Sequence, residues 1–229
     1  MEAVSTFLEN FDLSQLLDLL IQVAAALLCV SFHEMGHGYA AWLLGDSTAK
    51  RRGRVSMNPL RHIDPLGLLL LVTAGFGWAK PVPVDMQHFR RPKLGMALTA
   101  LAGPFSNFLM GTAALLAASA LYHVALAQLM TTLWLYNLFL FLVRIAVLSM
   151  GLGIFNLIPI PPLDGSKVVF SLLPDRVYYT ILRYERYLMF LLFALVFLNV
   201  LDAPLSVLLN GGLRGLCWLT GFPPDVLGL

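Results

Sequence analysis

The stretch "CVSFHEMGHGYAAWLLG", residues 29–45, places two histidines and a glutamate inside a long apolar run. The run covers residues 15–44, and as a helix it would be about 45 Å long at about 1.5 Å per residue. A helix of that length can cross a bilayer core of about 30 Å even when it is tilted. Ionisable residues inside such a span are costly and usually functional. The stretch therefore predicts a membrane helix that carries a functional site.

The composition of the whole chain supports the membrane class. Of 229 residues, 59% are hydrophobic and 12% are charged, and the mean hydropathy is +0.78. Soluble domains carry about 25% charged residues, so a soluble core of this size could not hide so many apolar side chains. We expect an all-α integral membrane protein, a polytopic helical bundle forming one domain over residues 1–229. Its core would be residues 15–201, followed by an apolar C-terminal tail over 203–229.

The apolar segments and the basic loops together predict a topology. Most of the 15 lysines and arginines lie in three loops, residues 45–65, 79–93 and 161–186. Because basic loops remain on the cytoplasmic side, all three should be cytoplasmic. This requires residues 66–78, which are too short to span, to enter and leave on one side as a re-entrant or β-like element after the first helix. The acidic N-terminus would lie outside. The five apolar segments are residues 15–44, 66–78, 94–122, 133–160 and 187–201, and Asn210-Gly211-Gly212 should interrupt the tail.

The pattern His33-Glu34-Met35-Gly36-His37 predicts a metal site. Residues four apart share one face of a helix, so His33 and His37 can ligate one zinc ion. Glu34 can then act as general base on a water activated by the metal. Gly36 needs no chemical role, although it allows close backbone approach. Histidines used only for packing are the alternative, which the cost of three ionisable groups in an apolar span makes less attractive.

A third zinc ligand must come from elsewhere in the chain. "NLIPIPPLDGSK", residues 156–167, offers Asp164 at the cytoplasmic end of the fourth apolar segment. The prolines of this stretch end the helix, and a turn at Gly165 would present the carboxylate. The alternative is that Asp164 caps the next helix. The residues alone leave both roles open.

Four motifs make the chain resemble the site-2 protease family of intramembrane zinc metalloproteases. They are "FHEMGH" within the opening stretch, "RVSMNPLRHIDPLG" (54–67), "GPFSN" (103–107) and "NLIPIPPLDG" (156–165). The similarity covers most of residues 30–170. No PDZ or CBS domain, of the kind often found in that family, fits the short loops and tail.

The resemblance implies roles that spacing alone does not assign. It makes Asp164 the third ligand of a single Zn²⁺ ion. It implies that Asn156 stabilises the oxyanion formed during attack on the carbonyl, the alternative being a helix–helix hydrogen bond. For Asn107 in "GPFSN", a packing turn beside the site is an alternative to catalysis.

A segment after the first helix is a candidate for substrate binding. Residues 53–58, "GRVSMN", combine strand propensity at Val55 with the turn formers Asn58-Pro59. An exposed strand edge here could pair with an unwound substrate backbone. Packing of the loop at headgroup level is the alternative. The predicted contacts are Arg54, Val55, Ser56, Met57 and Asn58.

These observations predict an intramembrane zinc endopeptidase. It would hydrolyse single-span membrane proteins near the cytoplasmic side of the cell membrane, with the lipid bilayer as its other partner. Its oligomeric state stays open, and no nucleic-acid partner is expected. One alternative is a metal-ion transporter or channel that uses His33, His37 and Asp164, but transport would not require Glu34. Another is a catalytically silent chaperone, against which the intact motifs argue.

Several residues receive no functional role from the sequence. Cys29 is interpreted as a small packed side chain and His62 as an interfacial residue of a basic loop. His88 and His123 fall outside the motifs. Arg144 lies in the fourth apolar segment, where the sequence offers no reason for a charge.

Overall fold

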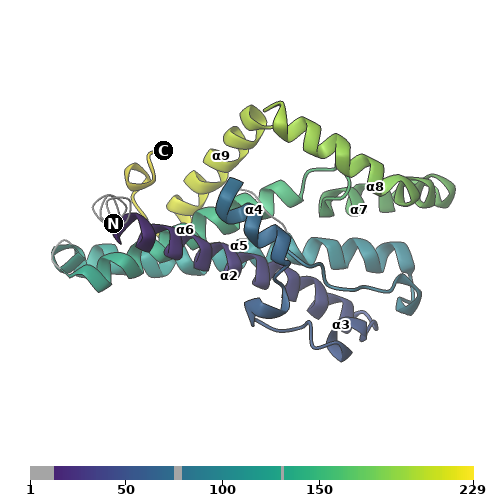
Figure 1. The fold of residues 1–229 in the computed structure, drawn as a ribbon, viewed down its shortest axis with the longest axis horizontal. Coiled ribbons are helices and arrows are strands. Elements are labelled where there is room, and N and C mark those ends of the chain that lie inside the picture. Colours follow the sequence, from purple (N-terminus) through teal and green to yellow (C-terminus); the bar gives the residue numbers. More distant parts are fainter. Residues whose placement is uncertain (1–12, 75–78, 130–131) are drawn as a thin grey trace, which may run out of the picture.

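The computed structural model describes residues 13–74, 79–129 and 132–229, and within these ranges the chain is helical and contains no strand (Figure 1). This confirms the prediction of an all-α fold. In chain order the helices are α2 (Leu13–Leu43), α3 (Thr48–Arg51), α4 (Pro65–Ala74), α5 (Pro92–Leu129), α6 (Leu133–Asn156), α7 (Asp164–Ser171), α8 (Asp175–Phe197) and α9 (Asp202–Thr220). Short 3₁₀ turns η1 (Pro59–Arg61), η2 (Met86–His88) and η3 (Pro224–Leu227) complete the described elements.

Three described helices are long and apolar enough to cross a membrane: Gln15–Leu43, Pro92–Val124 and Leu133–Asn156. They correspond to three of the predicted spans. The predicted span over 187–201 is instead part of a bent pair, because α8 and α9 meet at 82°. The pair Tyr187–Phe197 and Asp202–Thr220 makes a fourth span if it crosses as one unit.

The prediction that Asn210-Gly211-Gly212 interrupts the tail was wrong. Helix α9 continues through all three residues. A side chain at Gly212 would lie 3.2 Å from Met150 Sδ and 3.3 Å from Ile154 Cδ1, both on α6. The glycine therefore lets α9 approach α6 closely, and packing between the two helices offsets its low helix propensity.

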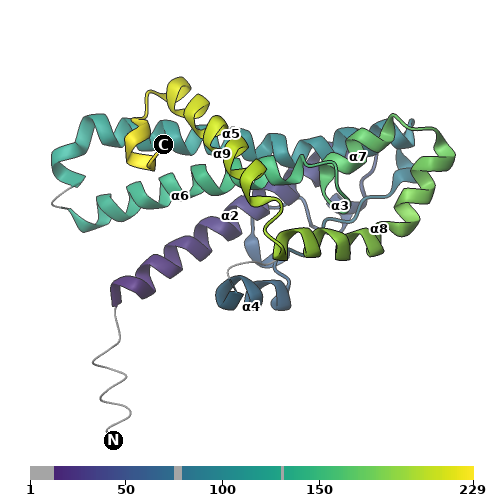
Figure 2. The ribbon, with the colours of Figure 1, turned by 90° about the horizontal axis from the view of Figure 1, so that it is seen from above.

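Helix α5 is central to the bundle and packs against α2, α6 and α7 (Figure 2). Small residues let the helices approach. A side chain at Gly36 of α2 would come within 2.8 Å of the Ala102 carbonyl oxygen and of Ser106 Oγ, both on α5. The close approach expected at Gly36 is thus confirmed, and it brings the histidine-bearing part of α2 against α5. The buried apolar cluster of the bundle includes Ala25, Cys29, Ala114, Leu115, Ala118, Phe139, Ile145, Ala146, Leu213 and Leu216.

The structure explains the charge of Arg144. Its Nη1 donates to the Asp18 carbonyl oxygen at 2.9 Å, and its Nη2 pairs with Asp18 Oδ1 at 3.2 Å. The contact joins α6 to the N-terminal part of α2. Figure 2 shows this end of α2 splayed away from α5 and α6. The pair is therefore a polar contact between α6 and the N-terminal part of α2.

The predicted re-entrant segment contains a short helix. Helix α4 has 10 residues, which is about 15 Å and too little to span a bilayer. Asp64 caps it, accepting from the backbone N–H groups of Leu66 and Gly67 at 3.0 and 3.1 Å. Residues 75–78 lie outside the described ranges. In the described residues the predicted β-like character is limited to one isolated antiparallel bridge between Ile63 and Ala79.

The end of α6 differs from the prediction in two respects. The helix stops at Asn156 rather than near residue 160, because residues before prolines avoid the helical conformation. The turn expected at Gly165 is also not found, since Gly165 is the second residue of α7. A Cβ atom there would lie 2.0 Å from the Leu157 carbonyl oxygen. Glycine is therefore required for close approach between α7 and the end of α6.

Replacing Gly165 by alanine should displace the start of α7. The new methyl group cannot fit against the backbone of Leu157, so we expect a loss of about 3 kcal/mol or more in stability. Thermal unfolding in detergent micelles checks this. Gly211→Ala is the matched control, because a Cβ atom there meets nothing within 4 Å. A helical Gly→Ala change at such a site should stabilise by about 0.5–1 kcal/mol. Equal effects of the two substitutions would contradict this account of α7.

Candidate metal centre

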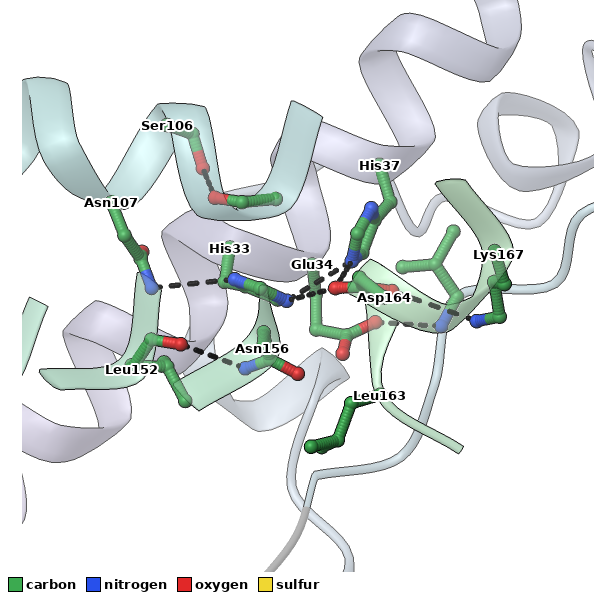
Figure 3. Close-up of polar contacts among 12 residues, drawn as sticks. His33, Glu34, His37, Ser106, Asn107, Leu152, Asn156, Leu163, Asp164 and Lys167 are labelled. Atoms are coloured by element: carbon green, nitrogen blue, oxygen red, sulfur yellow. Dashed lines mark hydrogen bonds and ion pairs between the residues drawn. The ribbon is translucent and has the colours of Figure 1, made fainter. Parts of the chain in front are cut away.

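Two helices that are far apart in the sequence bring three candidate ligands together. His33 and His37 lie one turn apart on α2, and Asp164 is the first residue of α7. Asp164 Oδ2 lies 3.1 Å from His33 Nε2 and 3.1 Å from His37 Nε2, and the two Nε2 atoms are 3.0 Å apart (Figure 3). The structure thus unites the three residues predicted as ligands.

The donor set fits a single zinc ion. The ligand atoms are two imidazole nitrogens and one carboxylate oxygen, all within 4.8 Å of one another. His33 is 5% exposed and Asp164 is 6% exposed. Buried lone pairs that converge in this way repel unless a cation lies between them. Three protein ligands of these types with an open fourth position are the pattern of a catalytic zinc site.

Each candidate ligand is also held from its other side. His37 Nδ1 lies 2.7 Å from the Thr99 carbonyl oxygen, and His33 Nδ1 lies 3.3 Å from Asn107 Nδ2. Asp164 Oδ1 lies 3.5 Å from Lys167 Nζ, which leaves Oδ2 facing the histidines. Such outer contacts orient metal ligands in known metalloproteins.

The motif "GPFSN" on α5 supports α2 at this point. A side chain at Gly103 would lie 2.4 Å from His37 Cε1 and 2.7 Å from His33 Cε1, so the absence of a side chain makes room for both rings. Ser106 Oγ contacts the Phe32 carbonyl oxygen at 3.1 Å and the Gly103 carbonyl oxygen at 2.7 Å. The motif therefore holds the histidine-bearing turn of α2 by shape and by hydrogen bonding.

Asp164 has the charge that metal binding requires. Burial by itself raises the pKa of Asp164, but the imidazoles of His37 and His33 and the ammonium of Lys167 outweigh it. The pKa of Asp164 therefore lies well below its ordinary value. The carboxylate is ionised at neutral pH, the form that binds cations.

Glu34 lies beside the three candidate ligands without joining them. Its Oε2 accepts a hydrogen bond from the Val82 backbone N–H at 2.8 Å. Val82 belongs to residues 79–85, which run past the site without regular secondary structure. In the described part of the chain, no hydrogen bond reaches the other carboxylate oxygen. Glu34 is thus fixed by one oxygen and has the second available for a proton.

A cavity of about 530 Å³ connects the site with the membrane-spanning helices. Its polar part contains the three candidate ligands, Glu34, Asn156 and Lys167. Part of its apolar lining comes from α2 and α6, two candidate spans. These apolar wall residues include Ala26, Leu27, Val30, Leu152 and Phe155.

The two candidate asparagines occupy different positions. Asn156, the last residue of α6, lines the cavity and donates from Nδ2 to the Leu152 carbonyl oxygen at 3.0 Å. Asn107 is fully buried and contacts His33. Figure 3 shows Asn107 and Lys167 at opposite ends of the ligand cluster.

The predicted substrate segment lies behind the cavity wall. None of residues 54–58 is among the described residues that line the cavity, whereas Ala79, Pro81, Val82 and Val84 are. Arg54 Nη2 donates to the Lys80 carbonyl oxygen and, at 3.2 Å, to the Pro81 carbonyl oxygen. Arg54 therefore holds the segment that does line the cavity.

His62 is a residue of the site that the sequence interpretation missed. It is 2% exposed and lines the cavity, although the sequence interpretation assigned it no functional role. Its Nε2 donates to the Ser56 carbonyl oxygen at 2.8 Å, because a carbonyl can only accept. The signal was its place in "RVSMNPLRHIDPLG", a stretch already singled out at residues 54–67.

Asp46 anchors the far end of the segment over residues 79–85. The side chain is fully buried just after α2. It accepts from the backbone N–H of Asp85 at 2.7 Å, from that of Thr48 at 2.9 Å and from His88 Nδ1 at 3.0 Å. Together with Arg54 and Glu34, it ties the cavity-lining segment to α2 and the loop that follows.

The comparisons with known proteins agree with this geometry. The family model described as peptidase family M50 matches residues 121–199, a range that includes α6 and Asp164. A Bacillus subtilis protein named "Putative zinc metalloprotease YwhC" is 37% identical over 190 residues, covering 81% of this chain and 84% of that protein.

More distant relatives carry the same description. "Putative zinc metalloprotease Rip2" of Mycobacterium tuberculosis is 30% identical over 202 residues, covering 86% of this chain and 71% of that protein. Its counterpart in Mycolicibacterium smegmatis is 30% identical over 151 residues, covering 64% of this chain and 54% of that protein. No solved structure matches the chain significantly.

The anchoring role of Asp46 predicts a pH-dependent stability. Burial by itself raises the pKa of Asp46, but hydrogen bonds from Asp85, Thr48 and His88 outweigh it and hold the pKa below its ordinary value. The ionised group therefore stabilises the fold above about pH 4, and this stabilisation is lost as the pH falls further. Asp46→Asn should cost about 1–3 kcal/mol at neutral pH, and the difference should shrink in acid.

Thermal unfolding in detergent between about pH 3 and pH 7 measures this difference. Asp225→Asn changes an exposed carboxylate and should follow the unsubstituted chain at every pH. A deficit of Asp46→Asn that stays constant across the range would show that the lost contacts do not depend on ionisation.

Proposed function

The chain belongs to peptidase family M50, the site-2 protease family, and from this premise we propose that it is a zinc endopeptidase that cuts its substrates within the membrane. Family membership and the names of the relatives support a membrane metalloprotease. The proposal of cleavage within the membrane rests mainly on one observation: His33, His37 and Asp164 lie close together beside Glu34. This cluster lies in a cavity whose lining includes residues of α2 and α6, two candidate membrane spans.

The residues of the site have three separate roles in the proposed reaction: metal binding, proton transfer and stabilisation of the oxyanion. His33, His37 and Asp164 hold one Zn²⁺ ion, which supplies Lewis-acid activation of water at neutral pH. Glu34 accepts the proton of the attacking water through the oxygen that Val82 does not engage. Asn156 lines the same cavity, and the N–H that does not bond Leu152 is available to the oxyanion.

The cavity is suited to a substrate that arrives from lipid. A transmembrane helix conceals its peptide bonds in its own hydrogen bonds, so it must unwind before it is cut. Unwound backbone in an apolar medium needs replacement partners. We assign this function to residues 79–84, which pass Glu34 without regular secondary structure and are held by hydrogen bonds from Arg54. The cavity is not lined by the other residues of the segment predicted to bind substrate, which are Val55, Ser56, Met57 and Asn58.

The orientation of the protein follows from its basic loops. Because lysine and arginine remain on the cytoplasmic side, the loops after α2 and before α5 should face the cytoplasm. The metal centre lies near the same ends of these helices. The proposed site of cleavage is therefore near the cytoplasmic face of the cell membrane.

Removing the general base should separate metal binding from catalysis. Glu34→Gln should retain zinc and lose about 10²–10⁴-fold in cleavage rate, because that is the usual contribution of proton transfer to a side chain. Asp164→Ala should lose most of the zinc, because it removes one of three ligands. Zinc content and cleavage of a single-span model substrate, both measured on purified protein, check these expectations.

The same preparations distinguish the alternative function. A Glu34→Gln variant with full cleavage activity would remove Glu34 from the mechanism. Zinc flux into liposomes by a wild-type chain that cleaves no membrane substrate would favour a transporter.

The support that Arg54 gives to the cavity-lining segment predicts an effect on substrate binding. Arg54→Ala frees the Lys80 and Pro81 carbonyl oxygens, so KM should rise by about tenfold, or about 1.4 kcal/mol, with zinc content unchanged. Arg51→Ala removes an exposed arginine of the same basic loop and is the matched control for charge. Equal changes in KM for both variants would point to loop charge, and not to this support, as the cause.

A further inference from the structure

The two candidate histidine ligands are held through their second ring nitrogens by partners of different kinds. His37 Nδ1 faces the Thr99 carbonyl oxygen at 2.7 Å. A carbonyl oxygen only accepts hydrogen bonds, so His37 Nδ1 carries the proton and its Nε2 carries the lone pair. A metal ion binds that lone pair. Thr99 therefore sets His37 in the tautomer that can bind a metal through Nε2.

His33 faces a side-chain amide where His37 faces a carbonyl. Its Nδ1 lies 3.3 Å from the amide of Asn107. An amide has a donor end and an acceptor end, and a half-turn of the group exchanges them without moving other atoms. With the nitrogen toward the ring, His33 Nδ1 accepts, and Nε2 carries a proton and cannot bind a metal. With the oxygen toward the ring, Nδ1 carries the proton and Nε2 is free to bind.

The Asn107 side chain has no other hydrogen-bonding role in the described part of the chain. Asn107 is fully buried, and its Nδ2 contacts only His33. Its Oδ1 is also buried and has no hydrogen-bond partner among the described residues. A buried amide with one unpaired end costs about 1–3 kcal/mol. A residue that only shaped the packing here could be apolar and avoid that cost.

We propose that Asn107 turns its carbonyl oxygen to His33 and accepts the Nδ1 proton, so that His33 binds the metal through Nε2. The inference rests on the proposed function, because it presupposes zinc between His33, His37 and Asp164. It makes Asn107 a positioning residue that acts through His33.

The surroundings of Asn107 hold it in place for this role. Ser106, the residue before it, contacts the carbonyl oxygen of Phe32, the residue before His33. The contacts of Ser106 with Phe32 and of Asn107 with His33 thus fix the position of α5 along α2 at the metal centre. Since Gly103 leaves room for both imidazole rings, the same turn of α5 provides space for His33 and its hydrogen-bond acceptor.

Two substitutions separate an acceptor from a donor at this position. In Asn107→Asp the side chain keeps its shape and accepts only, so zinc affinity should stay within about threefold of the unsubstituted chain. In Asn107→Leu the shape is similar and the acceptor is lost, so zinc affinity should fall by about 10–100-fold. Titration of the purified chain with Zn²⁺ against a chromogenic chelator measures both zinc affinities.

Three further measurements make the test specific. Asn156→Leu changes another asparagine of the cavity, whose described hydrogen bond goes to the Leu152 carbonyl oxygen and not to a candidate ligand, and the variant should keep its zinc affinity. Thermal unfolding in the presence of a chelator shows whether the Asn107 variants remain folded. Histidine ¹⁵N spectra of the zinc-loaded wild-type chain should show the Nδ1–H form for His33, which tests the tautomer without any substitution.

Each outcome of these measurements either supports or contradicts the role proposed for Asn107. An Asn107→Asp variant as weak as Asn107→Leu would mean that the amide nitrogen donates and would overturn the proposal. An Asn107→Leu variant with wild-type zinc affinity would overturn it as well. If Asn107→Leu does not fold, the Asp variant and the ¹⁵N spectrum decide. A wild-type chain that binds no zinc contradicts the proposed function itself, a result distinct from failure of the Asn107 assignment.

Discussion

The convergence of two imidazoles and one carboxylate on a common point is the constraint on which the rest of the structure depends. The three buried ligand atoms lie 3.0–3.1 Å from one another, a spacing at which one cation can contact all of them. Holding them there requires two distant helices to meet with little tolerance. The glycines at positions 36, 103 and 165 lie at these contacts, and each stands where a side chain would collide with a neighbouring helix or ring. Small residues thus do more to form this site than large apolar ones.

Helix α5 supplies no candidate ligand and yet organises all three. It packs against α2 and α7, the two helices that carry the ligands. It offers the Thr99 carbonyl to His37 and the Asn107 amide to His33. A single rigid element that touches each ligand-bearing helix limits the relative motion of the others. Contact with α5 therefore fixes how α2 and α7 lie relative to each other at the metal centre.

The sequence was informative where chemistry is local. The spacing of His33 and His37 predicted a shared helix face, and the proline-rich end of α6 predicted a break before Asp164. The sequence could not reveal that Gly165 is needed for contact with Leu157, because that contact depends on how two helices meet. The contribution of His62 to the cavity was missed for a similar reason, because its burial depends on the tertiary path of the loop.

The pair between Asp18 and Arg144 bears on how the protein is made. An arginine near the middle of an apolar helix costs about 2.5–3.5 kcal/mol when that helix is inserted alone. Helix α2 leaves the ribosome long before α6, so its acidic residue is already in place when the arginine arrives. The charge in α6 thus finds its partner on a helix that is synthesised earlier. The order of synthesis, and not only the final packing, belongs to the information that assembles this enzyme.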